Sequence, residues 1–205
     1  MGANYNNSAW FYDRLSRIVY GKTLVNAQVY LLKHVPANSR VLIAGGGTGW
    51  ILEELSNIHP TGLSITYVEI AEHMMALSQK RNIASNKVTF INDAIENVIL
   101  PVDFDVVITP FLFDNFTEQT LVKVFDHIQP LLKKDGLWLN TDFQLTGKWW
   151  QQVLLKTMFL FFKVICGIEA SRLPAIGKRF AEAGYKVVDR KTFFGDFIVS
   201  EGYTK

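Results

Sequence analysis

The stretch VLIAGGGTGW, residues 41–50, decides the fold of this chain. Its apolar first part, Val41–Ala44, has the length and the residue types of a buried strand. Four glycines follow within five positions, and Trp50–His59 after them has the spacing of an amphipathic helix. A strand, a glycine turn and a helix in this order bring backbone N–H groups and a helix N-terminus against a ligand. Because glycine permits close approach and positive φ angles, the stretch predicts a ligand-binding loop.

The spacing of the glycines separates this loop from two well-known alternatives. Gly45, Gly47 and Gly49 give G-x-G-x-G. A dinucleotide fingerprint is G-x-G-x-x-G and would need a glycine where Trp50 stands, so a nicotinamide oxidoreductase is disfavoured. A P-loop ends in Gly-Lys-Ser/Thr, and no lysine lies nearby. The remaining alternative is a glycine turn that only packs the helix on the strand.

Composition restricts the class of protein. The chain has 205 residues, of which 49% are hydrophobic and 20% charged, which favours one globular domain with a sizeable core. A net charge of +2 gives no strong field for nucleic acid, so we expect no nucleic-acid partner. The only cysteine, Cys166, excludes an intrachain disulfide and suits a reducing cytoplasm. The first ten residues lack a basic and an apolar region, so we expect no signal peptide and a cytoplasmic location.

Strands and helices alternate along the middle of the chain. The strand Phe104–Pro110 is apolar throughout its centre, as expected of a parallel strand that is buried on both faces. Asn115 and Glu118 have the spacing of a capping box for a helix over Phe116–Ile128. This alternation predicts a parallel sheet with helices on both faces. The other predicted strands and helices of this part are Ser64–Glu69, Ala71–Asn82, Lys87–Asn92 and Leu137–Phe143, with a helix end and turn at Leu131–Gly136.

Two helices are predicted before the first strand, at Ser8–Tyr20 and Thr23–His34. They either cover the sheet or form a lid over a substrate pocket with Tyr12 near the ligand. After the fifth strand, Trp149–Ile168 is the most apolar stretch, and it carries Lys156 and Lys163 on one helical face. We expect a buried helix with a narrow solvated edge. A hydrophobic substrate wall, a dimer interface and a contact with a membrane surface are the alternatives.

The end of the chain predicts one helix and a hairpin. Leu173–Ala183 has helical spacing and is stopped by Gly184. Lys186–Phe194 and Phe197–Tyr203 then have the pattern of two strands, joined by a turn at Gly195 and Asp196.

Several motifs in this order resemble the class I S-adenosylmethionine (SAM) dependent methyltransferases. Val41–Gly49 is similar to their motif V-L-D-x-G-x-G-x-G, and LLKKDGLWL is similar to their turn before strand five. Acids close the second and third predicted strands at Glu69 and Asp93, as in the family. The resemblance implies an α/β, Rossmann-like doubly wound fold: a mostly parallel seven-stranded sheet with helices on both faces and a C-terminal antiparallel hairpin.

The resemblance also implies how one domain over residues 1–205 is divided. Residues 1–39 would form an N-terminal helical cap, residues 40–143 the cofactor-binding core, and residues 144–205 a helical insert with the hairpin.

The family resemblance implies SAM as the cofactor and gives it a place. The glycines would approach its methionine end, Glu69 would accept from both ribose hydroxyls, and Asp93 would accept from the adenine amine. Otherwise Glu69 is a solvated strand end and Asp93 a helix N-cap. Ile43 stands where the family usually has an acid that positions the methionine amine. The predicted cofactor-binding residues are Gly45, Gly46, Gly47, Thr48, Gly49, Glu69, Ile70, Asp93, Ala94, Thr109 and Pro110.

Methyl transfer from a sulfonium is an in-line displacement, which the protein supports chiefly by aligning donor and acceptor. A base is needed only for an acceptor that must lose a proton. Candidates are Tyr12, Asp114 and Asp142, each of which also has a structural interpretation. The four histidines show no paired ligand spacing and no carboxylates cluster in the sequence, so no metal is predicted.

The sequence thus favours methyl transfer to a small, apolar or aromatic acceptor, without a transmembrane segment and with a homodimer as one possibility. Ile43 also permits a non-catalytic SAM-binding or partner module on a methyltransferase scaffold. A protein or nucleic-acid methyltransferase is the third hypothesis. The near-neutral charge counts against it, and so does the sequence TPFL after the fourth strand, where amino-methylating nucleic-acid enzymes have N-P-P-Y or D-P-P-Y.

Overall fold

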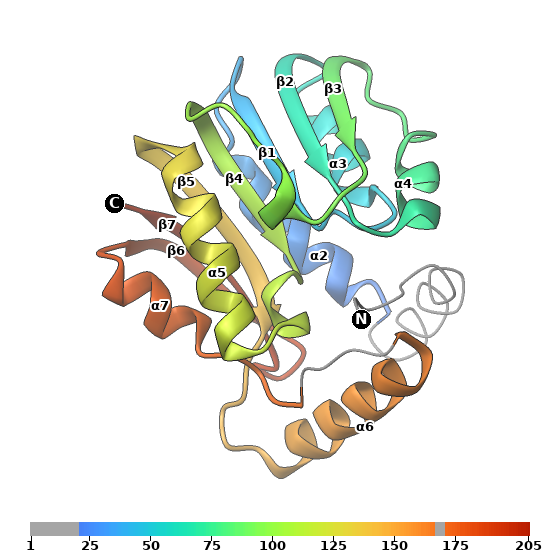
Figure 1. Cartoon of the computed structure of the whole chain (residues 1–205), viewed down its shortest axis with the longest axis vertical. Coiled ribbons are helices and arrows are strands. Elements are labelled where there is room, and N and C mark those ends of the chain that lie inside the picture. The colour runs from blue at the N-terminus through green and yellow to red at the C-terminus, as the bar shows by residue number, and fades with distance from the viewer. Residues whose placement is uncertain (1–20, 167–170) are drawn as a thin grey trace.

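A computed structural model describes residues 21–166 and 171–205 (Figure 1). The predicted helix Ser8–Tyr20, with Tyr12, lies outside the described residues.

The described chain forms a seven-stranded sheet in the order β3-β2-β1-β4-β5-β7-β6. β7 runs antiparallel to both of its neighbours, β5 and β6, and the other strand pairs are parallel, so the mostly parallel sheet with a C-terminal antiparallel hairpin is confirmed. The strand order reverses direction between β1 and β4, and ligands of open α/β sheets bind beyond the carboxyl ends of the strands at such a point. The strands are β1 Arg40–Ala44, β2 Thr61–Val68, β3 Ser85–Ile91, β4 Phe104–Pro110, β5 Leu132–Phe143, β6 Lys186–Phe193 and β7 Ile198–Thr204.

Helices cover both faces of the sheet (Figure 1). The α-helices are α2 Thr23–Tyr30, α3 Trp50–Ile58, α4 Glu72–Ser78, α5 Glu118–Ile128, α6 Trp149–Cys166 and α7 Ile176–Glu182. Short 3₁₀ helices are η2 Leu31–His34, η3 Ile95–Asn97, η4 Phe113–Asn115 and η5 Gln129–Leu131.

Strand β1 shows why the central strands are apolar at every position. Leu42 and Ala44 pack into the core that α5 and α7 cover, whereas Val41 and Ile43 pack into the opposite core under α3 and η2. Successive side chains of a strand point to opposite faces, so a strand between two helical layers needs apolar residues on both. The central strands of the doubly wound sheet are buried in this way.

Helix α2 packs against the last two strands of the chain, β6 and β7. Its residues Leu24 and Ala27 are buried, and the Ser200 hydroxyl donates to the Ala27 carbonyl oxygen at 2.7 Å. At the other end of the helix, the Tyr30 hydroxyl donates to Asp189 of β6 at 2.9 Å. These contacts support the interpretation of Thr23–His34 as a cover of the sheet.

The predicted start of α5 is wrong in its capping residue. Thr117 is the N-cap, and its hydroxyl oxygen accepts from the Thr120 amide at 3.3 Å. Asn115 belongs to the preceding 3₁₀ turn, where its amide donates to the Phe111 carbonyl oxygen at 3.0 Å. Glu118 accepts from the Ala175 amide at 3.0 Å, so a distant segment takes the side chain that a capping box would use.

The segment before Leu137 is also corrected. The helix end lies at Leu131, and β5 begins at Leu132 with a register shift against β4. The strand therefore includes most of the residues predicted as a turn.

Helix α6 differs most from its prediction. Gln151 and Leu155 are buried, but Trp149, Val153 and Leu160 are 77%, 57% and 65% exposed. The expectation of a buried helix with a narrow solvated edge is therefore wrong, because α6 lies beyond the edge of the sheet (Figure 1) and its side with Trp149, Val153 and Leu160 is exposed. None of the helices within residues 21–166 and 171–205 has both the length and the hydropathy to span a membrane.

Candidate functional site

The glycine loop follows β1 directly and leads into α3. Gly45, Gly47 and Gly49 have φ angles of 70°, 62° and 81°, a region that favours glycine over residues with a side chain. Gly46 has a different restriction, because a Cβ atom there would lie 2.3 Å from the ring of Tyr67. The loop therefore needs glycine for its backbone conformation and for close packing against β2.

Tyr67 supports the loop from the neighbouring strand. The side chain is fully buried, its ring lies 5.6 Å from that of Phe90, and its hydroxyl donates to the Gly47 carbonyl oxygen at 2.8 Å. Burial raises the pKa of Tyr67 well above its ordinary value, so the hydroxyl keeps the proton that it donates. The sequence analysis did not single out Tyr67, although its position two residues before Glu69 placed it on the strand beside the loop.

Glu69 comes directly after β2 and reaches the same loop. Its two carboxylate oxygens accept from the Gly47 and Ala71 amides, each at 2.9 Å, and the residue is 6% exposed. Burial raises the pKa of Glu69, and the two backbone donors oppose this shift. Each oxygen has two lone pairs, so both retain capacity for a further donor. The structure therefore excludes the interpretation of Glu69 as a solvated strand end.

Arg81, which follows α4, also contacts the glycine loop, at Thr48. Its Nε donates to the Thr48 carbonyl oxygen at 2.8 Å, and its guanidinium lies 4.4 Å from the centre of the Trp50 ring. It also pairs with Glu53 of α3 at 3.3 Å. A lone arginine after a helix gave no signal of this role in the sequence.

The end of β3 lies beside Glu69. The Asn92 amide donates to the Glu69 and Ile70 carbonyl oxygens at 2.7 and 3.1 Å, which joins the ends of β2 and β3. Asp93 is exposed and accepts from the Ala94 amide at 2.7 Å and from the Asn97 side chain at 3.1 Å. The N-cap position itself belongs to Ala94, so Asp93 stabilises the turn from one residue earlier.

At the end of β4, the Thr109 side chain belongs to the core, and only the backbone lies toward the ligand. Thr109 is fully buried; its hydroxyl donates to Asn140 Oδ1 at 2.8 Å and accepts from the Trp138 indole N–H at 3.0 Å. This side chain is therefore committed to the core, and only the backbone near Pro110 leads toward the ligand end. Phe111 follows with a φ of 52°, an unusual value for a bulky residue and a common one at functional turns.

Asp142 and Asp114 form a carboxyl pair at the same end of the sheet. Asp142 is 2% exposed and accepts from the Phe113 and Phe143 amides at 3.2 and 2.9 Å. Burial raises the pKa of Asp142 to about 7. The pKa of Asp114 is raised well above its ordinary value by burial and by the neighbouring negative charge of Asp142. Both carboxyl groups therefore bind a proton more readily than exposed aspartates do.

An apolar cluster lies beyond this carboxyl pair. It joins the ends of β5 and β7 to the inner side of α6, and adjacent rings of Phe143 and Phe197 lie 5.0 Å apart. Its buried members are Leu24, Ala27, Phe143, Leu155, Phe197 and Ile198, with Phe111, Trp150, Leu154, Met158, Phe159, Leu173, Phe193 and Phe194 packed against them.

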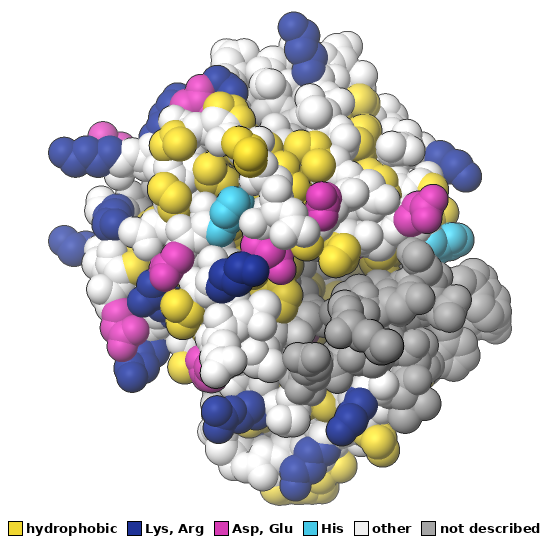
Figure 2. Space-filling view, in the orientation of Figure 1, with side chains coloured by type: hydrophobic (Ala, Val, Ile, Leu, Met, Phe, Trp, Pro, Cys, Tyr) yellow, Lys and Arg dark blue, Asp and Glu magenta, His cyan; other side chains and the backbone are white. Residues whose placement is uncertain are grey.

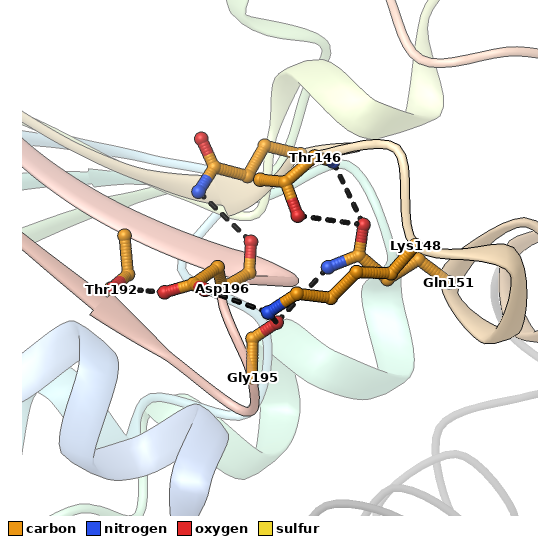
Figure 3. Close-up of polar contacts among 7 residues, drawn as sticks. Thr146, Lys148, Gln151, Thr192, Gly195 and Asp196 are labelled. Atoms are coloured by element: carbon orange, nitrogen blue, oxygen red, sulfur yellow. Dashed lines mark hydrogen bonds and ion pairs between the residues drawn. The ribbon is translucent and has the colours of Figure 1, made fainter.

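A polar network fixes the start of α6 on the hairpin turn (Figure 3). Gln151 is fully buried; it accepts from the Thr146 amide at 2.8 Å and donates to the Gly195 carbonyl oxygen at 3.0 Å. The Lys148 ammonium donates to the same oxygen at 3.0 Å and pairs with Asp196 at 2.8 Å. Gly195 and Asp196, which the sequence predicted as the hairpin turn, thus also position α6 and the apolar cluster.

One hollow lies away from this end of the sheet. A shallow hollow is found at the start of β5, opposite the glycine loop, and is lined by Asp126, Gln129, Pro130, Leu132, Lys133, Lys134, Tyr185 and Lys205. Within the described ranges, no three His, Cys, Asp or Glu side chains are grouped as a metal site would require.

Comparisons with known proteins identify the class. A family model described as a methyltransferase domain matches residues 41–136. This part of the chain is a methyltransferase domain. The match begins at β1 and ends within β5, so it contains the glycine loop, Glu69 and Asp93. The family resemblance found in the sequence is thereby confirmed.

Two relatives from Bacillus have the same name. The malonyl-[acyl-carrier protein] O-methyltransferase of Bacillus cereus is 34% identical over 144 residues, which cover 68% of this chain and 51% of that protein. The protein of the same name from Bacillus anthracis is 31% identical over the same shares. The chain therefore spans about half the length of these relatives.

Solved structures share the fold of the methyltransferase domain. The magnesium protoporphyrin IX methyltransferase of Synechocystis, with bound S-adenosylhomocysteine (SAH), has a TM-score of 0.71 at 16% identity, covering 98% of this chain and 96% of that one. A Burkholderia thailandensis 1,6-didemethyltoxoflavin-N1-methyltransferase, also with SAH, has a TM-score of 0.67 at 16% identity, covering 95% and 83%. At this identity the likeness concerns the fold alone.

Proposed function

We propose that the chain is a SAM-dependent methyltransferase. The observation that carries this proposal is the buried Glu69 carboxylate on the Gly47 amide, inside a matched methyltransferase domain. The backbone of the glycine loop is held open by three positive φ angles, and a Cβ atom at Gly47 would meet only Met74 Sδ, at 4.0 Å. A ligand can therefore approach the backbone there closely.

The proposed cofactor site uses the residues predicted from the sequence. Glu69 would accept from the ribose hydroxyls with its remaining lone pairs. Ile70, which is 49% exposed, would cover one side of the adenine, and Asp93 with Ala94 would meet its amine edge. When bound, SAM supplies an electrophilic methyl group on its sulfonium. The glycine loop, from Gly45 through Thr48 to Gly49, would hold the methionine end.

Ile43 bears on how that methionine end is held. Its side chain is fully buried in the core under α3, so it offers the amine no charge. The proposal therefore assigns the amine to carbonyl oxygens of the loop, whose geometry Tyr67 and Arg81 fix.

We propose that this carboxyl pair takes the proton from a methyl acceptor that must lose one before it attacks the methyl group. Asp142 holds the turn of η4 through the backbone amides and acts as a positioning residue. Asp114 accepts at Oδ1 from Asn115 at 2.7 Å. Because the pKa of Asp142 is about 7, this carboxyl group can exchange a proton with a bound acceptor at low cost near neutral pH.

The acceptor we propose is a small molecule with an apolar or aromatic body. The apolar cluster behind Phe111 and Phe143 supports this choice, because such walls bury ligand surface that water would otherwise cover. A second candidate is O-methylation of a carboxyl group on an acyl chain, which the names of the Bacillus relatives favour. An acyl chain would also pack against this cluster.

The deciding experiment is isothermal titration of the chain with SAH, beside NADH. We expect binding of SAH only. Glu69→Ala should weaken binding about tenfold or more, because a hydrogen bond to a charged group is worth about 1.5–3 kcal/mol. Glu54→Ala, a half-buried acid on α3, is the matched control and should leave binding unchanged.

Failure of wild-type SAH binding would contradict the proposal and leave a non-catalytic module on this fold. If SAH binds, mass spectrometry of a panel of apolar phenols, carboxylic acids and acyl thioesters measures the added methyl group. Methylation of the acids but not the phenols would favour the second candidate.

A further inference from the structure

The outer side of α6 carries an exposed apolar stripe. Trp149, Val153 and Leu160 are 77%, 57% and 65% exposed. Their spacings of four and seven residues place them on one side of a helix, over a length of roughly 16 Å at about 1.5 Å per residue. Lys156 and Lys163 lie along the same side and are exposed. We call these five residues the outer stripe.

The outer stripe has a positive charge. The sequence from Trp149 to Lys163 contains two lysines and no acidic residue. Within the part of the chain that the structure describes, neither Lys156 nor Lys163 is in an ion pair, whereas Lys148 pairs with Asp196. In Figure 2, hydrophobic and basic side chains lie next to each other at the lower end of the molecule, where Figure 1 places α6.

Isolated apolar residues on a surface are common, but an exposed tryptophan aligned with leucine and valine is a contiguous feature. The chemistry of the stripe matches a bilayer interface. Tryptophan and leucine enter the boundary between headgroups and acyl chains, and lysines reach the phosphates with their long side chains. Anionic lipids then add attraction of about 1 kcal/mol for each lysine near the surface.

We propose that α6 lays its outer stripe on the surface of an anionic lipid bilayer. The helix rests in the plane of the interface and does not cross it. The polar network at its start sets its angle to the domain, because Gln151 and Lys148 fix that end on the hairpin. The domain itself stays on the aqueous side of the stripe.

The inner side of the same helix has a different contact. Leu154, Leu155, Met158 and Phe159 pack on the apolar cluster at the acceptor end. The helix therefore lies between the bilayer and the proposed acceptor site. This consequence rests on the proposed function: an acceptor dissolved in the bilayer would reach the site along α6.

Vesicle flotation tests the proposal with the full chain and without cofactor, so its result is independent of methyl transfer. Vesicles are made of phosphatidylcholine alone or with phosphatidylglycerol. We expect binding to the anionic vesicles and roughly thirtyfold or more weaker binding after Lys156→Glu with Lys163→Glu, since each lysine contributes about 1 kcal/mol near an anionic surface and about 1.4 kcal/mol is a factor of ten. Trp149→Ser with Leu160→Ser should weaken it by a similar factor, because the apolar part of the stripe is lost.

Matched controls carry the same chemistry elsewhere. Ile99→Ser with Val102→Ser removes two side chains that are 97% and 68% exposed in the loop before β4. Lys80→Glu with Lys87→Glu reverses the charge of two exposed lysines, one shortly after α4 and one in β3. Both controls should bind vesicles like the wild type apart from a smaller, general charge effect in the second. Equal melting temperatures show that every variant folds.

Three outcomes would overturn the proposal. The first is no binding to anionic vesicles, and the second is binding that the controls weaken as much as the α6 variants. The third is found by sedimentation velocity: self-association that Leu160→Ser abolishes, without vesicle binding, assigns the stripe to a second copy. Titration of the same samples with SAH reports separately on the proposed function.

Discussion

The carboxyl edge of the sheet has two ends, one at the glycine loop and one at α6, and they are built in different ways. At the glycine loop, the backbone itself forms the site, and the side chains of Tyr67, Glu69 and Arg81 hold its amides and carbonyls in place. At the α6 end, aromatic and aliphatic side chains form a wall, and buried Gln151 attaches that wall to a turn. The first end is suited to one fixed ligand. The second can accommodate other shapes by changing a few side chains.

The largest effect is expected from Gly46→Ala, which breaks the glycine-loop end alone. The new Cβ would lie 2.3 Å from the buried Tyr67 ring, so loop and strand must move apart. We expect SAH binding to fall about 100-fold, in line with overpacking costs of about 1–3 kcal/mol. Titration calorimetry measures it. Gly177→Ala on α7, where no atom lies within 4 Å, is the control and should bind normally; equal affinities for the two variants would contradict the prediction.

Gln151→Ala tests the α6 end of this edge. It removes the acceptor for Thr146 and the donor to Gly195, and a buried polar group left without a partner costs about 1–3 kcal/mol. Hydrogen exchange should accelerate in α6 by roughly tenfold or more, as that free energy predicts, while SAH affinity stays constant. Gln152→Ala, exposed one position later, should leave exchange unchanged. A loss of SAH affinity would mean that the two ends are coupled.

The carboxyl pair lies between the two ends and gives a prediction on pH. The folded pKa of Asp142, about 7, is above its unfolded value of about 3.9. The folded state therefore binds more protons between these values, and stability from this group is present at low pH and lost as pH rises toward 7.

Asp142→Asn should reduce this loss, because it removes the titrating group and also the neighbouring charge that raises the pKa of Asp114. Urea unfolding should show the variant gaining stability relative to wild type at pH 8 compared with pH 5, by about 1.4 kcal/mol for each unit of pKa change. Asp135→Asn, at an exposed position, is the control. A difference that is the same at both pH values would show that the raised pKa values of this pair do not contribute to folding stability.

The smallest effect is expected from Tyr67→Phe, which sharpens the account of the loop. It removes one hydrogen bond to Gly47 and keeps the ring that packs on Gly46. SAH affinity should fall by about 0.5–1.5 kcal/mol, the net value of a typical hydrogen bond. Tyr185→Phe, at a buried tyrosine of the other core, serves as the comparison and should not change affinity. Identical binding of both variants would mean that the hydroxyl does not shape the loop.

The sequence predicted most of the glycine-loop end. Glycine spacing, the strand before it and the acid at Glu69 are local patterns, and the structure brings them together as expected. The sequence did not predict that the Thr109 side chain is buried, with its hydroxyl hydrogen-bonded to Asn140 and Trp138 in the core. Which face a strand residue points to depends on register, and register is decided by neighbouring strands.

By itself, then, the sequence determined the succession of strands and helices along the chain, the parallel sheet with helices on both faces, and the loop with its acid, because each is encoded in local patterns of periodicity and of glycine. Only the tertiary structure decided that Tyr67 closes over Gly46, that Asp114 and Asp142 share one environment, and that α6 leaves a side exposed. These features join residues far apart in the chain. They depend on which surfaces remain uncovered once the core has packed, and no local pattern contains that information.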